Sequence, residues 1–378
     1  MSKYVNAYST VREEVPWPAG IAHSGPIHSR TVASGGGRHP VIASPYEGDD
    51  AAEMQDHLEG FYRYAVSQGM ERAGSYNSLI HSTAQHIATT RRQYVFERGD
   101  DFQPSDLAEF RDWAAASNSV FFIQGDNRVR DAAGADLLDP ATVQRDSSYT
   151  APQHPEARRR RDRIRGNLWD EGIKIAPTLP PVVSESEIIL RPPQQLVERA
   201  TALFVTAEVA THVLDNRAVD VEHLRTVAPV GFDSNTDAES AFISKAEAES
   251  PNYSAHTKQD AVHFGWGFVS AELLGWAANQ FDADVTTIEP AKVDRLREWL
   301  LPGPQAVEFR SLAEICDAYE YTFSMRWLAV EEGLAQERQS SPELHLQPMQ
   351  HSILLERHHA FAWMTTPRSS WDEVDLST

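Results

Sequence analysis

The stretch RPPQQLVERATALFVTAEVATHVLD, residues 191–215, contains the pattern that decides the fold class of the second half of the chain. Apolar side chains recur there at every third or fourth position, which places them in one stripe along a helix. Proline is tolerated in the first turn of a helix, so Pro192 and Pro193 mark the helix start. The stretch therefore predicts an amphipathic helix over 193–215, with an apolar stripe formed by Leu196, Ala200, Leu203, Phe204, Ala207 and Ala210.

Helical spacing continues on both sides of this stretch. Trp266, Val269, Leu273 and Trp276 form another stripe, and aromatic residues at this spacing are far more often core than part of a cofactor site. We expect a mainly α-helical domain over residues 156–378. Its predicted helices span 156–171, 193–215, 259–281, 291–300, 311–336 and 348–364.

The first half of the chain mixes helical and strand periods. Helical spacing occurs at 50–68, 76–89 and 105–116, and Gly69 is the expected C-terminal cap of the first of these helices. Apolar residues alternate or cluster at 4–11, 93–97, 120–123 and around Val129, which predicts strands. We therefore expect an α+β domain over 46–145, with helices packed on one face of a small antiparallel sheet.

Segments rich in glycine, proline and polar residues separate these elements. Residues 1–45 are expected to form an N-terminal strand and a loop rich in glycine and proline, which includes Gly35-Gly36-Gly37-Arg38. That tetrad lacks the lysine of a phosphate-binding loop. Residues 146–155 are polar and contain Pro152 and Pro155, so we expect the linker between the two domains there.

The composition narrows the functional classes. The 378 residues carry a formal net charge of −21, which argues against nucleic acid as a partner because phosphate backbones are also negative. No apolar run reaches the roughly 18 residues of a membrane span, and residues 1–15 lack the apolar centre of a secretory signal. The single cysteine, Cys316, excludes an internal disulfide framework and fits a reducing compartment. We expect a cytoplasmic protein without membrane contact.

Several motifs of the second half occur together in one known family. They are Arg163-Ile164-Arg165, Glu171-Gly172-Ile173 and Leu190-Arg191-Pro192-Pro193, the tryptophans Trp266, Trp276 and Trp327, the run LERHHAFAW at 355–363, and Trp371-Asp372-Glu373-Val374. In these motifs the chain resembles the bacterial family known as domain of unknown function 4272, over about residues 156–378. The resemblance brings no known activity with it.

The chain departs from the family pattern at two places. Gly267 and Val269 stand where the family tends to have arginine and glutamate, and Ser324-Met325-Arg326 stands where the family has Arg-Leu-His. If those polar residues served a family active site, this chain has lost part of that site. The departures therefore argue against a catalytic role.

The densest group of ionisable residues is Glu356-Arg357-His358-His359. Glu356 and His359 are three positions apart, so they share a helix face. A carboxyl group and an imidazole on one helix face suit an acid–base site, in which Arg357 is a further catalytic candidate. The structural alternative is that Glu356 and Arg357 link helices through charge-assisted hydrogen bonds and that His359 is a hydrogen-bonded core residue. The structural interpretation is favoured.

The same spacing also raises the possibility of a metal site. Glu-x-x-His is one half of a di-iron carboxylate site in helix bundles, which needs a second such motif and two more glutamates. The chain contains no second copy, but Glu208 and His212 lie four positions apart on the predicted helix at 193–215. The candidate metal ligands are therefore Glu356, His359, Glu208 and His212.

Two further motifs have both a functional and a structural interpretation. Arg158–Arg165 contains a dense arginine cluster that suits phosphate or RNA, or acidic residues of the protein itself. Trp371-Asp372-Glu373-Val374 could add two carboxylates to a site, or Trp371 could anchor the C-terminal segment on the helices. The structural interpretation is favoured for both motifs.

Two classes of function follow from these patterns. The expected class is a non-enzymatic binding or regulatory protein, with a protein partner or small ligand and without a cofactor, because no catalytic constellation is complete. The alternative class is a metal-dependent or acid–base hydrolase centred on Glu356 and His359, with a divalent metal as its cofactor in the first case.

Overall fold

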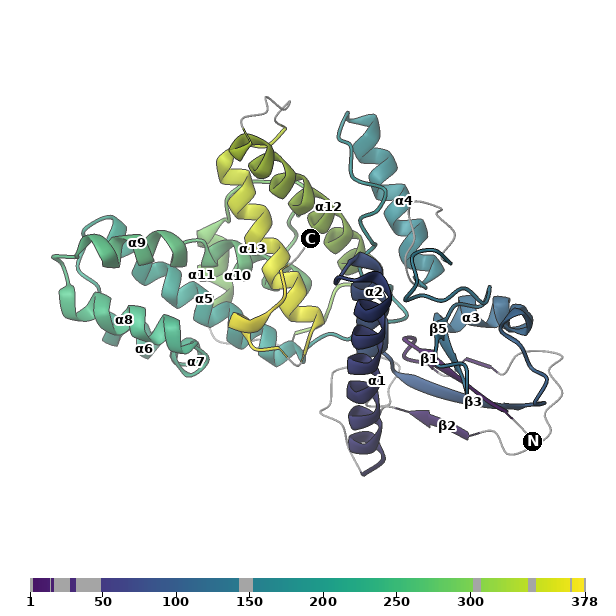
Figure 1. Cartoon of the computed structure of the whole chain (residues 1–378). Coiled ribbons are helices and arrows are strands. Elements are labelled where there is room, and N and C mark those ends of the chain that lie inside the picture. The colour runs from purple at the N-terminus through teal and green to yellow at the C-terminus, as the bar shows by residue number, and fades with distance from the viewer. Residues whose placement is uncertain are drawn as a thin grey trace. The chain divides into compact units, whose positions relative to one another are not determined.

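The computed structural model describes residues 3–13, 15–16, 28–31, 49–142, 152–301, 307–338, 345–367 and 369–376. The chain divides into two compact units, whose elements are labelled in Figure 1. Unit 1 comprises Met1–Arg163 with Ala176–Ile188, and unit 2 comprises Ile164–Ile175 with Ile189–Thr378. The glycine tetrad at 35–38 and most of the linker predicted at 146–155 lie outside the described residues, and the predicted domain boundaries stay predictions.

Unit 1 is built around a five-stranded antiparallel sheet (Figure 1). The central strand places Ala7 opposite both Tyr94 and Phe121 of its two neighbours. The small antiparallel sheet predicted from the sequence is confirmed, although one strand lies in a segment predicted as loop. In the order β2-β3-β1-β4-β5, the strands are β1 (Lys3–Ser9), β2 (His28–Thr31), β3 (Arg92–Arg98), β4 (Ser119–Ile123) and β5 (Val129–Arg130).

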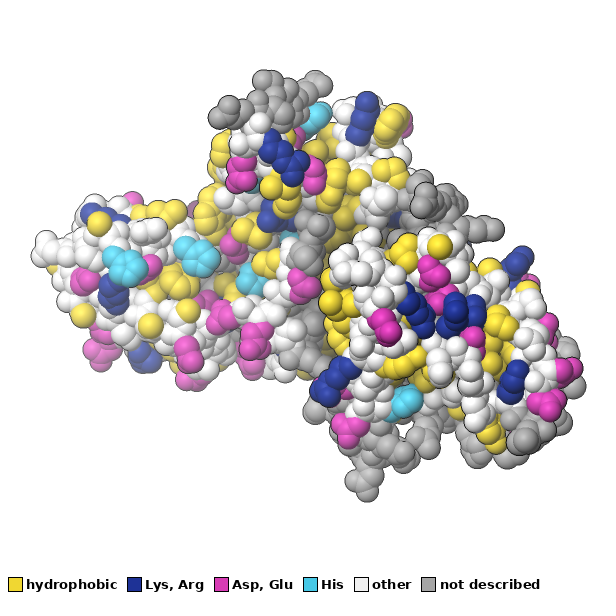
Figure 2. Space-filling model, viewed as in Figure 1, with side chains coloured by type: hydrophobic (Ala, Val, Ile, Leu, Met, Phe, Trp, Pro, Cys, Tyr) yellow, Lys and Arg dark blue, Asp and Glu magenta, His cyan; other side chains and the backbone are white. Residues whose placement is uncertain are grey.

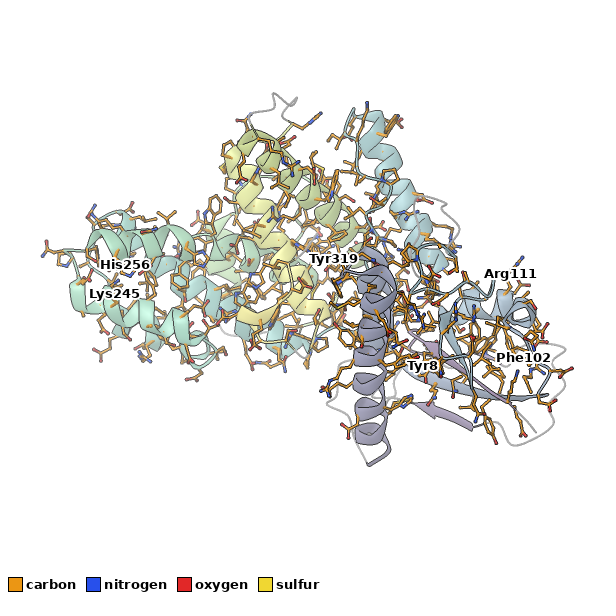
Figure 3. The ribbon with its side chains drawn as sticks, in the orientation of Figure 1. Tyr8, Phe102, Arg111, Lys245, His256 and Tyr319 are labelled. Carbon is orange, nitrogen blue, oxygen red and sulfur yellow. The ribbon has the colours of Figure 1, made fainter. Side chains whose placement is uncertain are left out.

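Helices cover both faces of this sheet, so the prediction of a single covered face was wrong. Side chains alternate along a strand, and in β1 Val5 faces one apolar cluster while Tyr8 faces the other. Figure 3 labels Phe102 in the first cluster and Tyr8 in the second. The first cluster contains side chains of η1 (Pro104–Phe110) and α3 (Arg111–Ser117), and the second contains side chains of α1 (Asp49–Ala73) and α2 (Ser78–Ala88).

Helix α1 runs past the end predicted for it. Gly69 lies inside the helix, which continues to Ala73, and Gly74 follows with a φ of +76°. Glycine adopts a positive φ at little cost, so Gly74 is the residue that lets the chain turn. Gly69 has a different role, because a Cβ there would lie 2.6 Å from Ile80 Cγ1. Its missing side chain lets α1 and α2 approach closely.

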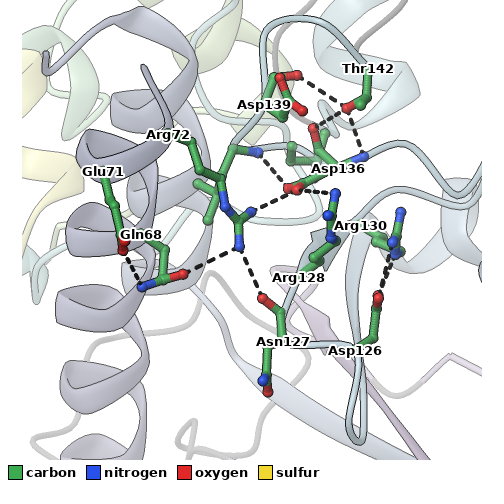
Figure 4. Close-up of polar contacts among 12 residues, drawn as sticks. Gln68, Glu71, Arg72, Asp126, Asn127, Arg128, Arg130, Asp136, Asp139 and Thr142 are labelled. Carbon is green, nitrogen blue, oxygen red and sulfur yellow. Dashed lines mark hydrogen bonds and ion pairs between the residues drawn. The ribbon is translucent and has the colours of Figure 1, made fainter. Parts of the chain in front are cut away.

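A buried carboxylate joins α1 to the β4–β5 hairpin (Figure 4). The Asp136 side chain is 0% exposed and accepts from Arg72 at 2.6 Å and from Arg128 at 3.2 Å. Its other oxygen accepts from the Leu138 N–H at 3.0 Å. Arg72 also donates to the carbonyl oxygen of Asn127 in the hairpin turn, at 3.2 Å. Because a buried charge is costly without partners, these contacts hold the hairpin in one position against α1.

Residues 176–188 complete unit 1 through Glu187. The Glu187 carboxylate accepts from the Thr10 hydroxyl, from Asn118 Nδ2 at 2.7 Å and from the Ser184 N–H at 3.0 Å. Burial by itself raises the pKa of this carboxyl, but the bonds from Thr10 and Ser184 outweigh burial and hold the pKa below its ordinary value. Glu187 therefore binds this segment to the ends of β1 and β4 as a carboxylate.

Unit 2 is a set of helices around α5 (Pro193–Leu214), the helix predicted from the opening stretch (Figure 1). α5 is buried over most of its length, and small residues such as Ala200 and Ala207 let neighbouring helices come close. In the described residues no helix combines the length and apolar character needed to cross a membrane. The other helices are the second half of α4 (Pro155–Asp170), α6 (Val221–Val227), α7 (Pro229–Asp233), α8 (Asp237–Glu249), α9 (Ala255–Phe264), α10 (Gly267–Ala277), α11 (Val293–Leu300), α12 (Leu312–Glu337), α13 (Pro348–Thr365) and η2 (Trp371–Glu373).

One predicted helix is broken, and three short helices were not predicted. Instead of a single helix over 259–281, the structure has α9 and α10. A Cβ at Gly267 would lie 3.1 Å from the Leu203 carbonyl oxygen, so glycine lets α10 cross α5 closely at this break. α6, α7 and α8 escaped prediction because their apolar stripes are short. The sequence does carry one signal for α8, the capping box formed by Thr236 and Glu239.

Replacing Asp136 by alanine tests the polar contacts of unit 1. We expect the free energy of unfolding to fall by about 2–4 kcal/mol, because Arg72 loses its buried partner and the Leu138 N–H stays buried without an acceptor. Glu59→Ala is the matched control, since it removes an ion pair with Arg63 that is mostly exposed and should cost less than about 1 kcal/mol. Urea unfolding followed by circular dichroism measures both, and an equal cost for the two variants would contradict the anchoring role of Asp136.

Candidate functional site

Helix α13 places the predicted site residues between neighbouring helices of unit 2. Successive residues of an α-helix point about 100° apart, so the four side chains of Glu356-Arg357-His358-His359 face in different directions. α13 packs against α10 and α12, and all four side chains are buried or half-buried. Each of the four therefore meets its own set of partners.

Glu356 lies against α10. Ser270 Oγ is 2.8 Å from Glu356 Oε2 and 3.1 Å from the main-chain carbonyl oxygen of Glu356. Burial raises the pKa of the Glu356 carboxyl above its ordinary value, while the hydrogen bond from Ser270 and the charge of His263 act in the opposite direction. Such a carboxyl keeps its proton to a higher pH than an exposed glutamate does, which is a property of general acids and of buried structural glutamates alike.

His359 holds the C-terminal segment. Its Nε2 lies 2.8 Å from the Trp371 carbonyl oxygen, so this nitrogen carries the proton and donates it. The imidazole also stacks on the Trp371 indole, with 4.0 Å between ring centroids, and the Arg199 guanidinium lies 4.9 Å from the same indole. Burial lowers the pKa of His359, so the ring is neutral at neutral pH. These contacts agree with the predicted anchoring by Trp371, while Asp372 and Glu373 are exposed.

Arg357 stabilises a loop. Its Nη1 donates to the carbonyl oxygens of Val285 at 2.8 Å and Thr287 at 3.0 Å, and the side chain is buried. These carbonyls belong to the connection between α10 and α11, where the main chain has no helical partners. The guanidinium therefore replaces hydrogen bonds that the loop cannot make by itself, which favours the structural interpretation of Arg357.

His358, which belongs to the predicted group but was given no separate role from the sequence, is the most buried of the four. It is 2% exposed, and its ring centroid lies 6.1 Å from that of Tyr319 and 5.6 Å from that of Phe323, both on α12. Its Nδ1 is buried and has no hydrogen-bond partner among the described residues. Burial lowers the pKa of His358 to about 4, and the nearby charge of Arg326 acts in the same direction. The imidazole is therefore neutral at neutral pH.

The candidate metal ligands on α5 have other partners. Glu208 forms an ion pair with Arg297, and His212 Nδ1 lies 2.8 Å from the Ala218 carbonyl oxygen. The hydrogen bonds and ion pairs of the described residues do not join this pair to Glu356. Nor does the described part of the chain contain a group of three or more His, Cys, Asp or Glu side chains that could hold a metal ion.

Buried ion pairs in unit 2 are the polar feature that sequence reasoning missed. Glu239 of α8 pairs with Arg199 of α5, and Glu320 of α12 pairs with Arg165 of α4 at 3.1 Å. The capping box that begins at Thr236 could have drawn attention to Glu239. No local pattern marks Glu320, because its partner is 155 residues away. Arg165 belongs to the predicted arginine cluster, and its pairing favours the structural interpretation of that residue.

The low pKa of His358 makes stability depend on pH. The unfolded chain binds a proton at this imidazole near pH 6.5, whereas the folded protein resists it down to about pH 4. The free energy of unfolding should therefore fall by about 3 kcal/mol as the pH drops through this window. His358→Phe keeps an aromatic ring and removes the titration, so its profile should be flatter. Urea unfolding across pH measures this, with the exposed His256→Gln as control, and a wild-type slope in His358→Phe would contradict it.

A comparison with known protein families identifies the second half of the chain. The model of the family described as Domain of unknown function (DUF4272) matches residues 160–374, which is more than half of the chain. The comparisons with curated proteins and with solved structures gave no match. The resemblance inferred from the run at 355–363 and its companion motifs is confirmed, and the chain belongs to the family described as Domain of unknown function (DUF4272).

Proposed function

We propose that this protein is a non-enzymatic binding or regulatory protein, in which Glu356-Arg357-His358-His359 is a structural centre of unit 2. The observation that carries the proposal is that neighbours within the unit occupy the polar groups of the candidates. Carbonyl oxygens accept from Arg357 and His359, and Ser270 is bonded to Glu356. A catalytic acid or base must be within hydrogen-bond reach of a substrate, and these groups are already engaged.

The partner that fits this proposal is a protein or a small ligand. The net charge of −21 repels nucleic acid, and Figure 2 shows Lys and Arg side chains interspersed with acidic ones on the visible face. Cys316 is buried and is the single cysteine of the sequence, which suits a reducing compartment such as the bacterial cytoplasm. The net charge thus supports the class of partner and the single cysteine supports the compartment, and neither argument depends on α13.

One observation favours the acid–base hydrolase as a second candidate. Burial raises the pKa of Glu356, and both Glu356 and His359 lie close enough to the exposed His263 for its charge to act on their pKa values. A buried carboxyl that keeps its proton can act as a general acid. The metal-dependent form has less support, because Glu208 and His212 are engaged elsewhere, and we derive no metal-assisted step.

Substitution of Glu356 tests its structural role. Glu356→Gln keeps the size of the side chain and its bond to Ser270, so we expect the thermal unfolding midpoint to stay within a few degrees of wild type or to rise. Glu356→Ala should lower the free energy of unfolding by about 2 kcal/mol, because it leaves a cavity and removes the shorter of the two hydrogen bonds of the Ser270 hydroxyl. Differential scanning calorimetry measures both variants. A Glu356→Ala variant as stable as wild type would refute the structural role.

Elemental analysis and turnover assays separate the two candidate functions. We expect the purified protein to contain no stoichiometric zinc, manganese or iron, and to show no hydrolysis of nitrophenyl esters or nitrophenyl phosphate that depends on Glu356. The exposed His256→Gln serves as the control variant. One metal ion per chain, or a hydrolytic activity that folded Glu356→Gln has lost and His256→Gln retains, would establish the hydrolase instead.

A further inference from the structure

Arg326 differs from the other arginines in the interior of unit 2. Arg165 and Arg199 pair with buried glutamates, and Arg191 and Arg357 donate to main-chain carbonyls. Arg326 is half-buried, yet nowhere in the described ranges does a carboxylate or carbonyl oxygen accept from it. Its Nε is buried without a hydrogen-bond partner in those ranges, as is that of Arg199, but Arg199 has the ion pair with Glu239 that Arg326 lacks. A guanidinium is always charged and has five donors, so leaving it partly desolvated and unpaired is costly.

A second group without a hydrogen-bond partner in the described residues, the Nδ1 of His358, lies near Arg326. Tyr319, Phe323 and Arg326 follow one another at spacings of four and three residues, so they share one face of α12, on which Figure 3 labels Tyr319. His358 of α13 contacts both of these rings, and its buried Nδ1 has no partner among the described residues. The charge of Arg326 acts on the pKa of His358, which places the guanidinium near the imidazole.

The charges around this pair limit what can bind there. Asp375 of the C-terminal segment raises the pKa of both His358 and Tyr319, so a carboxylate already lies nearby, and His359 is the next residue of α13. With both imidazoles neutral, Arg326 supplies one positive charge. Arg326 attracts an anion, while Asp375 disfavours each further negative charge nearby, so a monoanionic ligand fits better than a dianion.

We infer that Arg326 and His358 form a binding site for the carboxylate group of a small ligand. The planar guanidinium matches a carboxylate with two parallel hydrogen bonds. In the neutral tautomer that carries its proton on Nδ1, the His358 imidazole donates a third. Tyr319 and Phe323 provide aromatic surface for the apolar part of the ligand. This inference goes beyond the proposed function, because it assigns the chemistry of a ligand and uses the side of α13 that faces α12, away from Glu356.

Titration with acetate and butyrate tests the site. We expect both to raise the thermal unfolding midpoint of the full chain in a saturable way, and phosphate at equal ionic strength to raise it less. Arg326→Gln should weaken carboxylate binding at least tenfold, and Arg326→Lys should weaken it less, because lysine keeps the charge and loses the fork. The control is Arg338→Gln, an exposed arginine at the end of the same helix, which should bind like wild type.

The pKa of His358, followed by NMR of the histidine rings, gives a readout that does not depend on unfolding. Arg326→Gln should raise this pKa because it removes a nearby positive charge, and saturating acetate should raise it in wild type for the same reason. Arg326→Gln should fold, since it removes an unpaired charge, and Arg326→Met is a second variant with the same expectation. Equal acetate affinity in wild type and Arg326→Gln, tighter binding of phosphate than of acetate, or an unchanged His358 pKa in Arg326→Gln would each overturn the inference.

Discussion

Polar groups on a helix that is buried on several sides must find their partners inside the protein, and this requirement shapes unit 2 around α13. Arg357 donates to the carbonyls of one loop, and His359 donates to Trp371 in the C-terminal segment. At the end of the helix, Arg191 donates to the carbonyls of Trp363 and Thr366 and lies over the Trp363 indole at 4.2 Å. Two ionisable residues of α13 therefore tie a loop and the C-terminal segment to the helix, and Arg191 ties the segment before α5 to the end of the helix.

The same requirement operates in unit 1, where two buried carboxylates meet it in full, in contrast to two neighbouring groups of unit 2. Asp136 and Glu187 are buried carboxylates, and each is satisfied by several donors. Arg326 and the His358 Nδ1 lack such partners in the part of the chain that the structure describes. Unpaired polar groups reduce stability, and proteins retain such costs mainly where a function depends on them.

Gly267 and Ser324, two positions at which the sequence suggests departures from the family pattern, are tightly packed in this protein. Gly267 lies so close to the Leu203 carbonyl oxygen that a longer side chain needs α5 and α10 to move apart. Ser324 is fully buried, with its hydroxyl 3.5 Å from Glu320. Larger polar residues at these two positions require a different packing of the central helices.

Local patterns in the sequence determined which segments are helices and strands. The stripe from Leu196 to Ala210 predicted α5, and alternation predicted β1 and β3, because helical and strand periods are properties of neighbouring residues. The same patterns identified Glu356 and His359 as residues on one helix face. Only the tertiary structure decided the covering of both sheet faces, the association of residues 176–188 with the sheet, and the pairing of Glu320 with Arg165. These features depend on which distant segments pack together, and whether a charged side chain is paired or unpaired is set by that packing and by no local period.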